Sequence, residues 1–233
     1  SFTVDDGLKK PVKPPITENS KVIGIDLGVK TFATTSDGCK YNLTLDLNKS
    51  LKKLERLQRN LSRKSKGSKN RNKARLRVAR LHKRIANRRI DNLHKLSKII
   101  IIENQVIIVE NLDIRAMVRQ SVKSLARSIY DASWGRFKEM LCYKAEFYGR
   151  HLFKVNPSNT SKTCSNCLEI NENLTLDMRE WQCKHCHSEH DRDKNASKNV
   201  LRIGQELPEY QKALKESMND KSFIDSAIGS SFL

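Results

Sequence analysis

The chain has 233 residues, with 45 lysines and arginines against 26 aspartates and glutamates, which gives a formal net charge of +19 at pH 7. This length suits one main hydrophobic core with a small added module and excludes two large independent domains. No run of 18 apolar residues and no basic-then-apolar leader occurs, so neither a membrane span nor a secretory signal is predicted. A reducing, cytoplasmic location is therefore expected.

The N-terminal part predicts a short β-meander after an extended lead-in. Residues 1–20 contain Gly7, Pro11, Pro14 and Pro15 and are interpreted as a remnant strand at 2–4 followed by a linker. Residues 22–25 form an apolar strand that ends at Asp26. The β-forming residues 31–35 and the turn at Asp37-Gly38 predict a hairpin, and residues 41–45 predict a third strand.

From Leu47 the apolar spacing becomes helical and predicts two amphipathic helices separated by a polar turn at 65–72. The apolar stripes are Leu47, Leu51, Leu54, Leu57 and Leu61 in the first helix, and Val78, Leu81, Ile85, Leu93 and Leu96 in the second. Such a pair is expected to pack as a hairpin along its apolar seam, with a basic outer face.

This predicted hairpin, residues 46–98, holds 20 lysines and arginines but only three acidic residues, a net charge of +17. A solvated helix face is the ordinary interpretation of a charge run, but so one-sided a segment indicates a polyanion partner such as DNA or RNA. The residues predicted to contact nucleic acid are Arg71, Lys73, Arg75, Arg77, Arg80, Lys83 and Arg84.

The second half of the chain predicts further elements of an α/β fold. Residues 105–111 form a continuous apolar strand, typical of a central position covered on both faces, and this strand carries Glu110 near its end. A helix is predicted over 132–148, a strand over 151–156 and a last helix over 193–203. The tail beyond Leu207 is polar and shows no clear motif.

Four cysteines form two pairs, Cys164-x-x-Cys167 and Cys183-x-x-Cys186, with 15 residues between the pairs. This spacing predicts a structural zinc site with four thiolate ligands and no open coordination position. Unrelated free thiols and disulfides are the alternatives. The other two cysteines, Cys39 and Cys142, follow no pattern and are expected to be small buried side chains.

Three acidic residues, Asp26, Glu110 and Asp193, each follow a predicted buried strand or begin a helix beside one. Carboxylates that converge at sheet ends bind Mg²⁺, and two such ions activate water for hydrolysis of a phosphodiester. The alternatives are a turn or cap role for Asp26, a strand-end ion pair for Glu110 and a helix N-cap for Asp193. Asp191 is interpreted as a cap or a neighbouring group rather than a ligand.

Six segments occur in a characteristic order: GIDLGVKTFATTSDG, NRRIDNLHKLS, VIIVENL, TSKTCSNC, CKHC and DRDKNASKN. In these segments, over about residues 2–203, the chain resembles the TnpB family of OrfB-type, insertion-sequence-encoded proteins related to type V CRISPR effectors. The resemblance implies an α/β fold of the ribonuclease H-like (RuvC) class, in which helices flank a mixed sheet. It also implies a core at 21–160, with the basic hairpin at 46–98 inserted in it, a zinc ribbon at 161–190, a final core segment at 191–206 and a tail at 207–233.

The resemblance further implies RNA-guided cleavage of DNA, with Asp26, Glu110 and Asp193 as the magnesium-binding catalytic triad, a structural zinc ion, and DNA and a guide RNA as partners in a nucleoid-associated setting. The family's N-terminal β-barrel and helical region are not matched, because only about 20 residues precede the first strand. The alternative is therefore a truncated, catalytically idle remnant that binds nucleic acid. The GIDLG segment also occurs in phosphate loops of ATPases, but the chain shows no second phosphate loop.

The chain departs from the family pattern in the predicted ribbon. Leu168 and His187 stand directly after the second cysteine of each pair, where the family often has glycine. Glycine suits a left-handed backbone turn, so a looser ribbon is expected here, with His185, His187 and His190 as spare nitrogen ligands.

Overall fold

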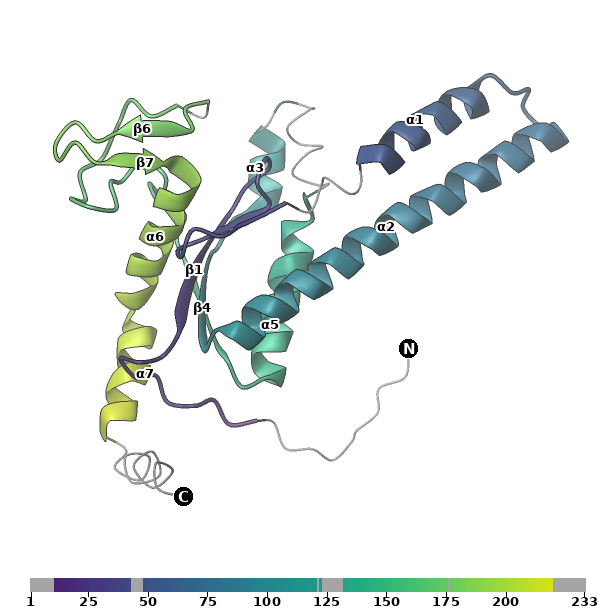
Figure 1. Ribbon diagram of the computed structural model, residues 1–233. Coiled ribbons are helices and arrows are strands. Elements are labelled where there is room, and N and C mark those ends of the chain that lie inside the picture. The colour runs from purple at the N-terminus through teal and green to yellow at the C-terminus, as the bar shows by residue number, and fades with distance from the viewer. Residues whose placement is uncertain (1–10, 43–47, 121, 123–131, 176, 220–233) are drawn as a thin grey trace.

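The computed structural model describes residues 11–42, 48–120, 122, 132–175 and 177–219. A mixed β-sheet with helices on both faces forms the body, a long helical hairpin projects from it, and a small two-stranded module lies near the start of a C-terminal helix (Figure 1). The predicted strand at 2–4 lies outside the described residues.

The main sheet has five strands in the order β3-β2-β1-β4-β5. Their bounds are β1 Val22–Leu27, β2 Ala33–Thr35, β3 Lys40–Tyr41, β4 Val106–Glu110 and β5 His151–Val155. The first three strands form an antiparallel meander, whereas β1, β4 and β5 run parallel. The third strand is shorter than predicted, and residues 43–47 lie outside the described part. The parallel step from β1 to β4 requires a long connection, which the helical hairpin provides.

One face of the sheet is covered by α2 (Lys69–Glu103) and α5 (Trp134–Phe147). Successive residues of a strand point to opposite faces, so Ile23 and Ile25 of β1 and Ile107 and Val109 of β4 share this face. They belong to one buried cluster with Leu93, Leu96, Ile100, Ile101, Phe137 and Leu141 of the two helices. All five residues of β4 are buried, which confirms the predicted central strand.

The opposite face is covered by α6 (Arg192–Gln205), with α7 (Pro208–Asn219) following it along the same side of the sheet (Figure 1). Val106 and Ile108 of β4 pack here against Val200 and Tyr210. Two glycines let α6 lie directly on the strands. A Cβ at Gly24 would overlap the Ser197 carbonyl oxygen and lie 2.7 Å from the Leu201 amide, and one at Gly204 would overlap the Ile108 side chain.

Two segments given no role in the core by the sequence are part of it. Ile16, in the predicted linker, is 1% exposed and belongs to the cluster beneath α6 and α7. Gln105 donates to the Pro15 carbonyl at 2.7 Å, which ties this segment to the sheet. The tail beyond Leu207 begins with α7, whose Tyr210 is 5% exposed. In each of these otherwise polar segments, a few apolar residues are enough to attach the segment to the core.

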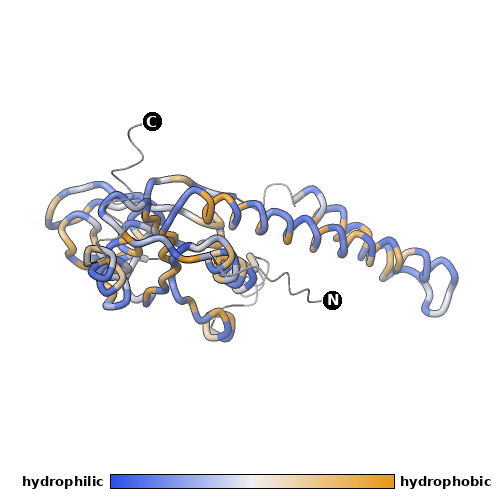
Figure 2. Tube along the Cα trace, turned by 90° about the horizontal axis from the view of Figure 1, so that it is seen from below, coloured by the Kyte–Doolittle hydropathy of each residue, from blue (hydrophilic) through white to orange (hydrophobic). Residues whose placement is uncertain are grey.

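The hairpin consists of α1 (Asn48–Ser62) and the N-terminal half of α2, which project as an arm (Figures 1 and 2). Leu54 packs against Val78, Leu81 and Ile85, and Leu57 and Leu61 complete this seam. Figure 2 shows hydrophobic positions alternating with hydrophilic ones along the arm. Ser68 caps α2, and the helix runs to Glu103, five residues beyond the predicted hairpin, because its apolar end covers the sheet. None of the described helices is long and apolar enough to cross a membrane.

The remaining elements are α3 (Ile114–Gln120), which the sequence did not predict, and the antiparallel strands β6 (Glu180–Gln182) and β7 (Glu189–Asp191). The predictions of a helix over 132–148, a strand over 151–156 and a helix from 193 are confirmed by α5, β5 and α6 within a few residues. Cys142 is half-buried, but Cys39 is exposed at the turn before β3, so the prediction that it is buried is wrong.

Candidate functional site

Asp26 and Glu110 lie at the same edge of the sheet, on the face that α6 covers. Their strands β1 and β4 are parallel neighbours, with Ile25 opposite Val109, so their carboxyl ends meet there. Residues two apart in a strand point to the same face of the sheet. Asp26 therefore shares a face with Gly24, which contacts α6, and Glu110 shares a face with Ile108, which packs against Gly204. Asp193 lies in the first turn of α6. The fold thus brings together three acids that are far apart in the sequence.

Asp26 lies within electrostatic reach of the other two carboxylates. Burial raises the pKa of Asp26 well above its usual value, and the negative charges of Glu110 and Asp193 raise it further. Like charges held close together in poorly hydrated surroundings oppose each other's ionisation. A divalent cation would relieve that repulsion, so this donor set of hard oxygens fits Mg²⁺.

Glu110 is 4% exposed, and burial raises its pKa from 4.5 to about 6. The Thr160 hydroxyl donates to Glu110 Oε1 at 2.6 Å, and this hydrogen bond opposes part of the rise because it favours the carboxylate. Thr160 is itself 3% exposed. One oxygen of Glu110 is therefore fixed by a buried hydroxyl group.

Two asparagines of α6 attach the loop that carries Thr160. Asn199 Nδ2 donates to the carbonyls of Thr160 at 2.9 Å and Thr163 at 2.7 Å. Asn195 Nδ2 donates to the Thr163 carbonyl at 2.8 Å, and its Oδ1 accepts from the Ser165 amide at 2.9 Å. Both asparagines are at most 1% exposed. The helix that carries Asp193 thus also positions the hydroxyl group that holds Glu110.

Asp193 is paired with an arginine from the small module. Arg179 Nη1 lies 3.1 Å from Asp193 Oδ1 and 3.5 Å from Oδ2, and the Asp193 side chain is 16% exposed. Within the described part of the chain, the three carboxylates do not form a group tight enough to hold an ion in their present conformations. Arg179 supplies positive charge that a bound cation would otherwise supply.

Asp191 has the capping role that the sequence suggested. Its Oδ1 accepts from the Lys194 amide at 2.9 Å at the N-terminus of α6, and its Oδ2 pairs with Lys40 Nζ at 2.6 Å. The pKa of Asp191 is lowered, because these hydrogen bonds outweigh the burial that would raise it. This carboxylate therefore joins the meander to α6.

The four predicted cysteines converge in the small module. The sulfur atoms of Cys164, Cys167, Cys183 and Cys186 all lie within 4.8 Å of one another, as ligands of one metal ion require. All six cysteines of the chain are reduced, so the disulfide alternative is wrong in this structure. The two pairs have the same backbone pattern: the Cys164 carbonyl accepts from the Leu168 amide at 2.9 Å, and that of Cys183 accepts from the His187 amide at 3.0 Å.

The left-handed turns expected after each pair are present without glycine. Leu168 has φ = 67° and His187 has φ = 57°, a region that costs a residue with a Cβ roughly 1–2 kcal/mol. Of the three histidines, His190 approaches the cluster, with Nε2 3.1 Å from Cys164 Sγ and 2.9 Å from Ser188 Oγ. Ser188 Oγ lies 3.0 Å from Cys186 Sγ, and this hydrogen bond, together with those from the Ser188 backbone and the Asn166 side chain, lowers the pKa of that thiol to about 5. A thiolate is the form that binds metal.

The predicted nucleic-acid contacts lie along α2, and all but one are exposed. The exception is Arg71, whose Nη1 donates to the carbonyls of Leu61 at 3.2 Å and Lys64 at 2.9 Å. This guanidinium group closes the C-terminus of α1 and is committed to the fold. Sequence analysis missed Thr160 and Arg179, for which the chain gives no local signal, and the pair Asn195 and Asn199, whose spacing of four residues was a usable signal.

Comparison with known families accounts for most of the chain. Residues 7–121 match the family described as probable transposase, OrfB of IS605, and residues 134–200 match the Cas12f1-like TNB domain. A protein of Streptomyces pristinaespiralis named as an RNA-guided DNA endonuclease is 42% identical over 82% of this chain and 47% of its own length. The chain belongs to the TnpB/OrfB family.

Other TnpB relatives agree. The RNA-guided DNA endonuclease InsQ of Escherichia coli K12 is 32% identical over 83% of this chain and 51% of its own length. A TnpB-like protein of Methanocaldococcus jannaschii is 27% identical over 88% of this chain and 76% of its own length. The chain spans about half the length of the first two relatives.

Solved structures with a related fold come from Cas12f complexes. The Cas12f1 chain in a cryo-EM complex with sgRNA and target DNA matches with a TM-score of 0.59 and 21% identity, over 78% of this chain and 49% of its own. A chain of a CRISPR-Cas12f ternary complex matches with a TM-score of 0.61 and 22% identity, over 86% of this chain and 41% of its own. At this identity the likeness concerns the fold, a mixed α/β arrangement.

Proposed function

We propose that this chain forms the nuclease core of a transposon-associated, RNA-guided DNA endonuclease of the RuvC type. The observation that carries the proposal is the placement of Asp26 and Glu110 at the carboxyl ends of the parallel neighbours β1 and β4, beside the first turn of α6 with Asp193. Burial and then the charges of Glu110 and Asp193 raise the pKa of Asp26 there. The strand order, with an antiparallel meander beside three parallel strands, supports the ribonuclease H-like assignment. The names of the relatives support DNA as the substrate.

In this proposal Asp26, Glu110 and Asp193 hold Mg²⁺, which would activate a water molecule for attack on a phosphodiester and stabilise the leaving oxygen. Thr160 keeps Glu110 oriented as a carboxylate acceptor. Arg179 neutralises Asp193 until the cation binds. Burial of Glu110 keeps its pKa near 6, so it ionises below neutral pH and is available as a ligand at pH 7.

The four cysteines hold a structural Zn²⁺ ion that fixes the ribbon at 161–190, and the ribbon presents Arg179 to the catalytic edge. The basic hairpin grips the nucleic acid, with DNA and a guide RNA as partners. A cytoplasmic, nucleoid-associated location belongs to the same proposal, since the six free thiols suit a reducing compartment.

The alternative is a catalytically idle remnant that retains the hairpin and ribbon and still binds nucleic acid. Two observations favour it. Arg179 pairs with Asp193, and among the described residues the three carboxylates do not form a group close enough to hold one ion. Both functions predict that the chain binds nucleic acid, but only the first predicts that it cleaves DNA. A single cleavage experiment therefore separates them.

The test measures Mg²⁺-dependent cleavage of end-labelled single- and double-stranded DNA by the purified chain, with copurifying RNA retained and the Asp193→Ala variant beside it. The expected result is cleavage by the wild type only, with the affinity for DNA unchanged in the variant. An equal loss of binding would make Asp193 a structural residue. Intact, salt-sensitive binding without cleavage by either protein would mean that this chain binds nucleic acid and that its catalytic residues await a partner.

A further inference from the structure

The helical hairpin has two unlike sides, which the seam between α1 and α2 defines. Leu54 of α1 packs against Val78, Leu81 and Ile85 of α2. An α-helix turns about 100° per residue, so the spacing of each exposed residue from these seam positions fixes the side on which it lies. The two helices are antiparallel, and one pair of residues marks each side of the seam.

On the side that we call the back face, Gln58 Nε2 lies 3.3 Å from His82 Nε2 across the seam. Both residues lie about 80° from the centre of their seam in the same sense, and Arg75 shares this position. Arg75 and His82 are exposed. The back face therefore carries amide, imidazole and little positive charge.

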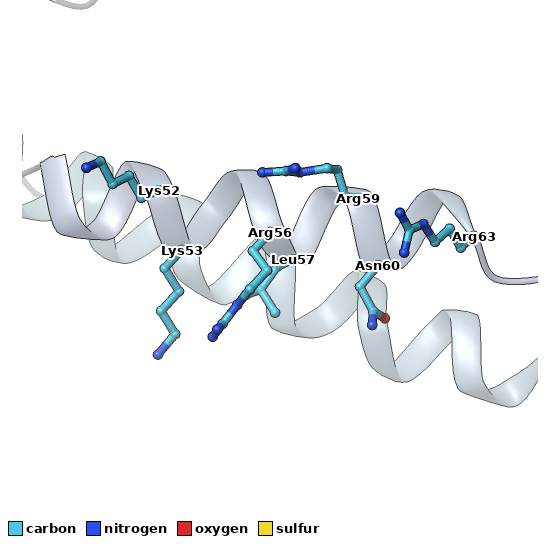
Figure 3. Close-up of a pocket in the computed structure, with 7 residues that line it drawn as sticks. All are labelled: Lys52, Lys53, Arg56, Leu57, Arg59, Asn60 and Arg63. Atoms are coloured by element: carbon cyan, nitrogen blue, oxygen red, sulfur yellow. The ribbon is translucent and has the colours of Figure 1, made fainter.

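The opposite side, which we call the front face, carries positive charge from both helices. Its members are Lys53 and Arg56 of α1 and Arg77, Arg80 and Arg84 of α2, all exposed. Arg88 Nη1, 3.5 Å from Ser50 Oγ, crosses the seam on this side. Lys53 and Arg56 also line a hollow of about 840 Å³ along α1, and Figure 3 shows them on one side of that helix together with Asn60.

The front face has no internal counter-charge within the described part of the chain. The two acids of the hairpin that the structure describes are engaged elsewhere, since Glu55 pairs with Arg59 at 3.2 Å and Asp91 with Lys95 at 2.7 Å. None of the five front-face side chains makes an ion pair with a described residue. Packed helices lie about 8–10 Å apart, so two rows of like charge face the same solvent within about one Debye length. A polyanion relieves this repulsion.

The chemistry of the hairpin favours contact with phosphates over contact with bases. Residues 48–103 contain no phenylalanine, tyrosine or tryptophan, so the arm offers no stacking platform for unpaired bases. The axes of two packed helices lie about 8–10 Å apart, which is between the widths of the minor and major grooves, about 6 and 12 Å. Long arginine side chains on the two rows can therefore reach phosphates of both strands beside one groove.

We propose that the front face binds the phosphate backbone of a nucleic-acid double helix along the arm, and that the back face stays free of it. This inference rests on the proposed function, in which the hairpin binds nucleic acid. It adds that binding occurs on the front face and that the ligand is double-stranded. It keeps Arg77, Arg80 and Arg84 of the sequence prediction and adds Lys53 and Arg56. Arg71 is excluded because it caps α1, and Arg75 because it lies on the back face.

The test compares matched substitutions in binding of a 20-base-pair DNA duplex across a salt series without Mg²⁺. Arg80→Gln on the front face is expected to lower the slope of log affinity against log salt by about 0.9, the effect of one lost phosphate contact. Arg75→Gln, with the same chemistry five residues away on the back face, is expected to leave the slope unchanged. Equal effects of the two substitutions would overturn the one-sided face.

A triple variant gives a larger effect with a charge-matched control. Arg56→Gln, Arg80→Gln and Arg84→Gln together should lower the slope by about 3, whereas Arg136→Gln, Lys212→Gln and Lys215→Gln, outside the hairpin, should not. Equal slopes for the two triples would overturn the inference, and so would a front-face loss seen with single-stranded oligothymidine but not with the duplex. If the wild type shows no salt-dependent binding, the proposed function fails too. A wild type that binds and cleaves beside an unaffected front-face triple overturns only this inference.

Discussion

The Thr160 hydroxyl donates to Glu110 Oε1 at 2.6 Å, although Thr160 belongs to the loop before the cysteine module and Glu110 ends the central strand. Asn199 of α6 holds the backbone of Thr160 at 2.9 Å. The orientation of Glu110 therefore depends on the loop and on the helix that carries Asp193. Disturbance of any of these three elements is transmitted to the carboxylate.

Thr160→Val keeps the shape of the side chain but removes the donor. Leaving a buried acceptor without its partner costs roughly 1–3 kcal/mol of unfolding free energy, and loss of a group that orients a metal ligand typically lowers metal affinity about 10- to 100-fold. Calorimetric titration with Mn²⁺ measures the second effect directly. Thr160→Ser, which retains the hydroxyl group, should bind Mn²⁺ like the wild type. Tight binding by the valine variant would show that Thr160 does not position Glu110.

Glu110→Gln should change how stability depends on pH. In the metal-free state the pKa of Glu110 is raised from 4.5 to about 6, so between these values the folded chain binds more protons than the unfolded one. The free energy of unfolding therefore falls as pH rises through this window, by about 2 kcal/mol at about 1.4 kcal/mol per pKa unit. The glutamine variant lacks this fall and should be the more stable protein at pH 7.5 without Mg²⁺.

The measurement is urea unfolding at pH 4.5, 6 and 7.5 in Mg²⁺-free buffer that leaves the cysteine-bound metal in place. Asp26 also has a raised pKa, to which the charge of Glu110 contributes, so both proteins keep some pH dependence, and the difference between them reports Glu110 together with its effect on Asp26. Parallel curves for wild type and variant would contradict the prediction.

Cys183→Ser should empty the cysteine site and loosen the module. A four-thiolate zinc site contributes its binding energy to folding, and Cys183 is 3% exposed, so it lies in the small core with Trp181 and Leu174. Elemental analysis should give about one zinc ion per wild-type chain and little in the variant. Cys142→Ser, outside the module, should keep its zinc. Full zinc content after Cys183→Ser would refute the ribbon assignment.

Gly24→Ala should be strongly destabilising, because the added methyl group meets backbone of α6, with the Leu201 amide at 2.7 Å. Overpacking of this kind typically costs 1–3 kcal/mol, and it would push α6 and Asp193 away from Asp26. Gly135→Ala in α5 is the matched control, since its methyl group would only touch Ile114 Cδ1 at 3.4 Å. Alanine is favoured over glycine in a helix by up to about 1 kcal/mol, so this variant should melt at or above the wild-type temperature. Equal melting of both variants would contradict the close docking of α6.

The local features of this chain were predictable from the sequence. Continuous apolar residues specified β4, leucine spacing specified the seam between α1 and α2, and two pairs of cysteines at a permitted spacing specified the cluster of four cysteines. These predictions succeeded because each depends on residues close together in the chain, through periodicity or ligand spacing. Asp26, Glu110 and Asp193 were predicted as magnesium ligands largely because the segments that carry them occur in the same order as in TnpB proteins.

Only the tertiary structure decided how distant residues meet. The bond from Thr160 to Glu110, the pair of Arg179 with Asp193 and the capping role of Arg71 join elements whose separation in the chain carries no periodic signal. Ile16 and Tyr210 stand in segments with little apolar pattern, yet both are buried. One large apolar side chain is enough to attach such a segment to the apolar surface that β4 and α6 already form. The sequence by itself determined which elements form and which residue types are available for chemistry. Packing of α6 onto β1 and β4 determined which of them share a site, because that contact depends on the absence of a Cβ at Gly24 and Gly204.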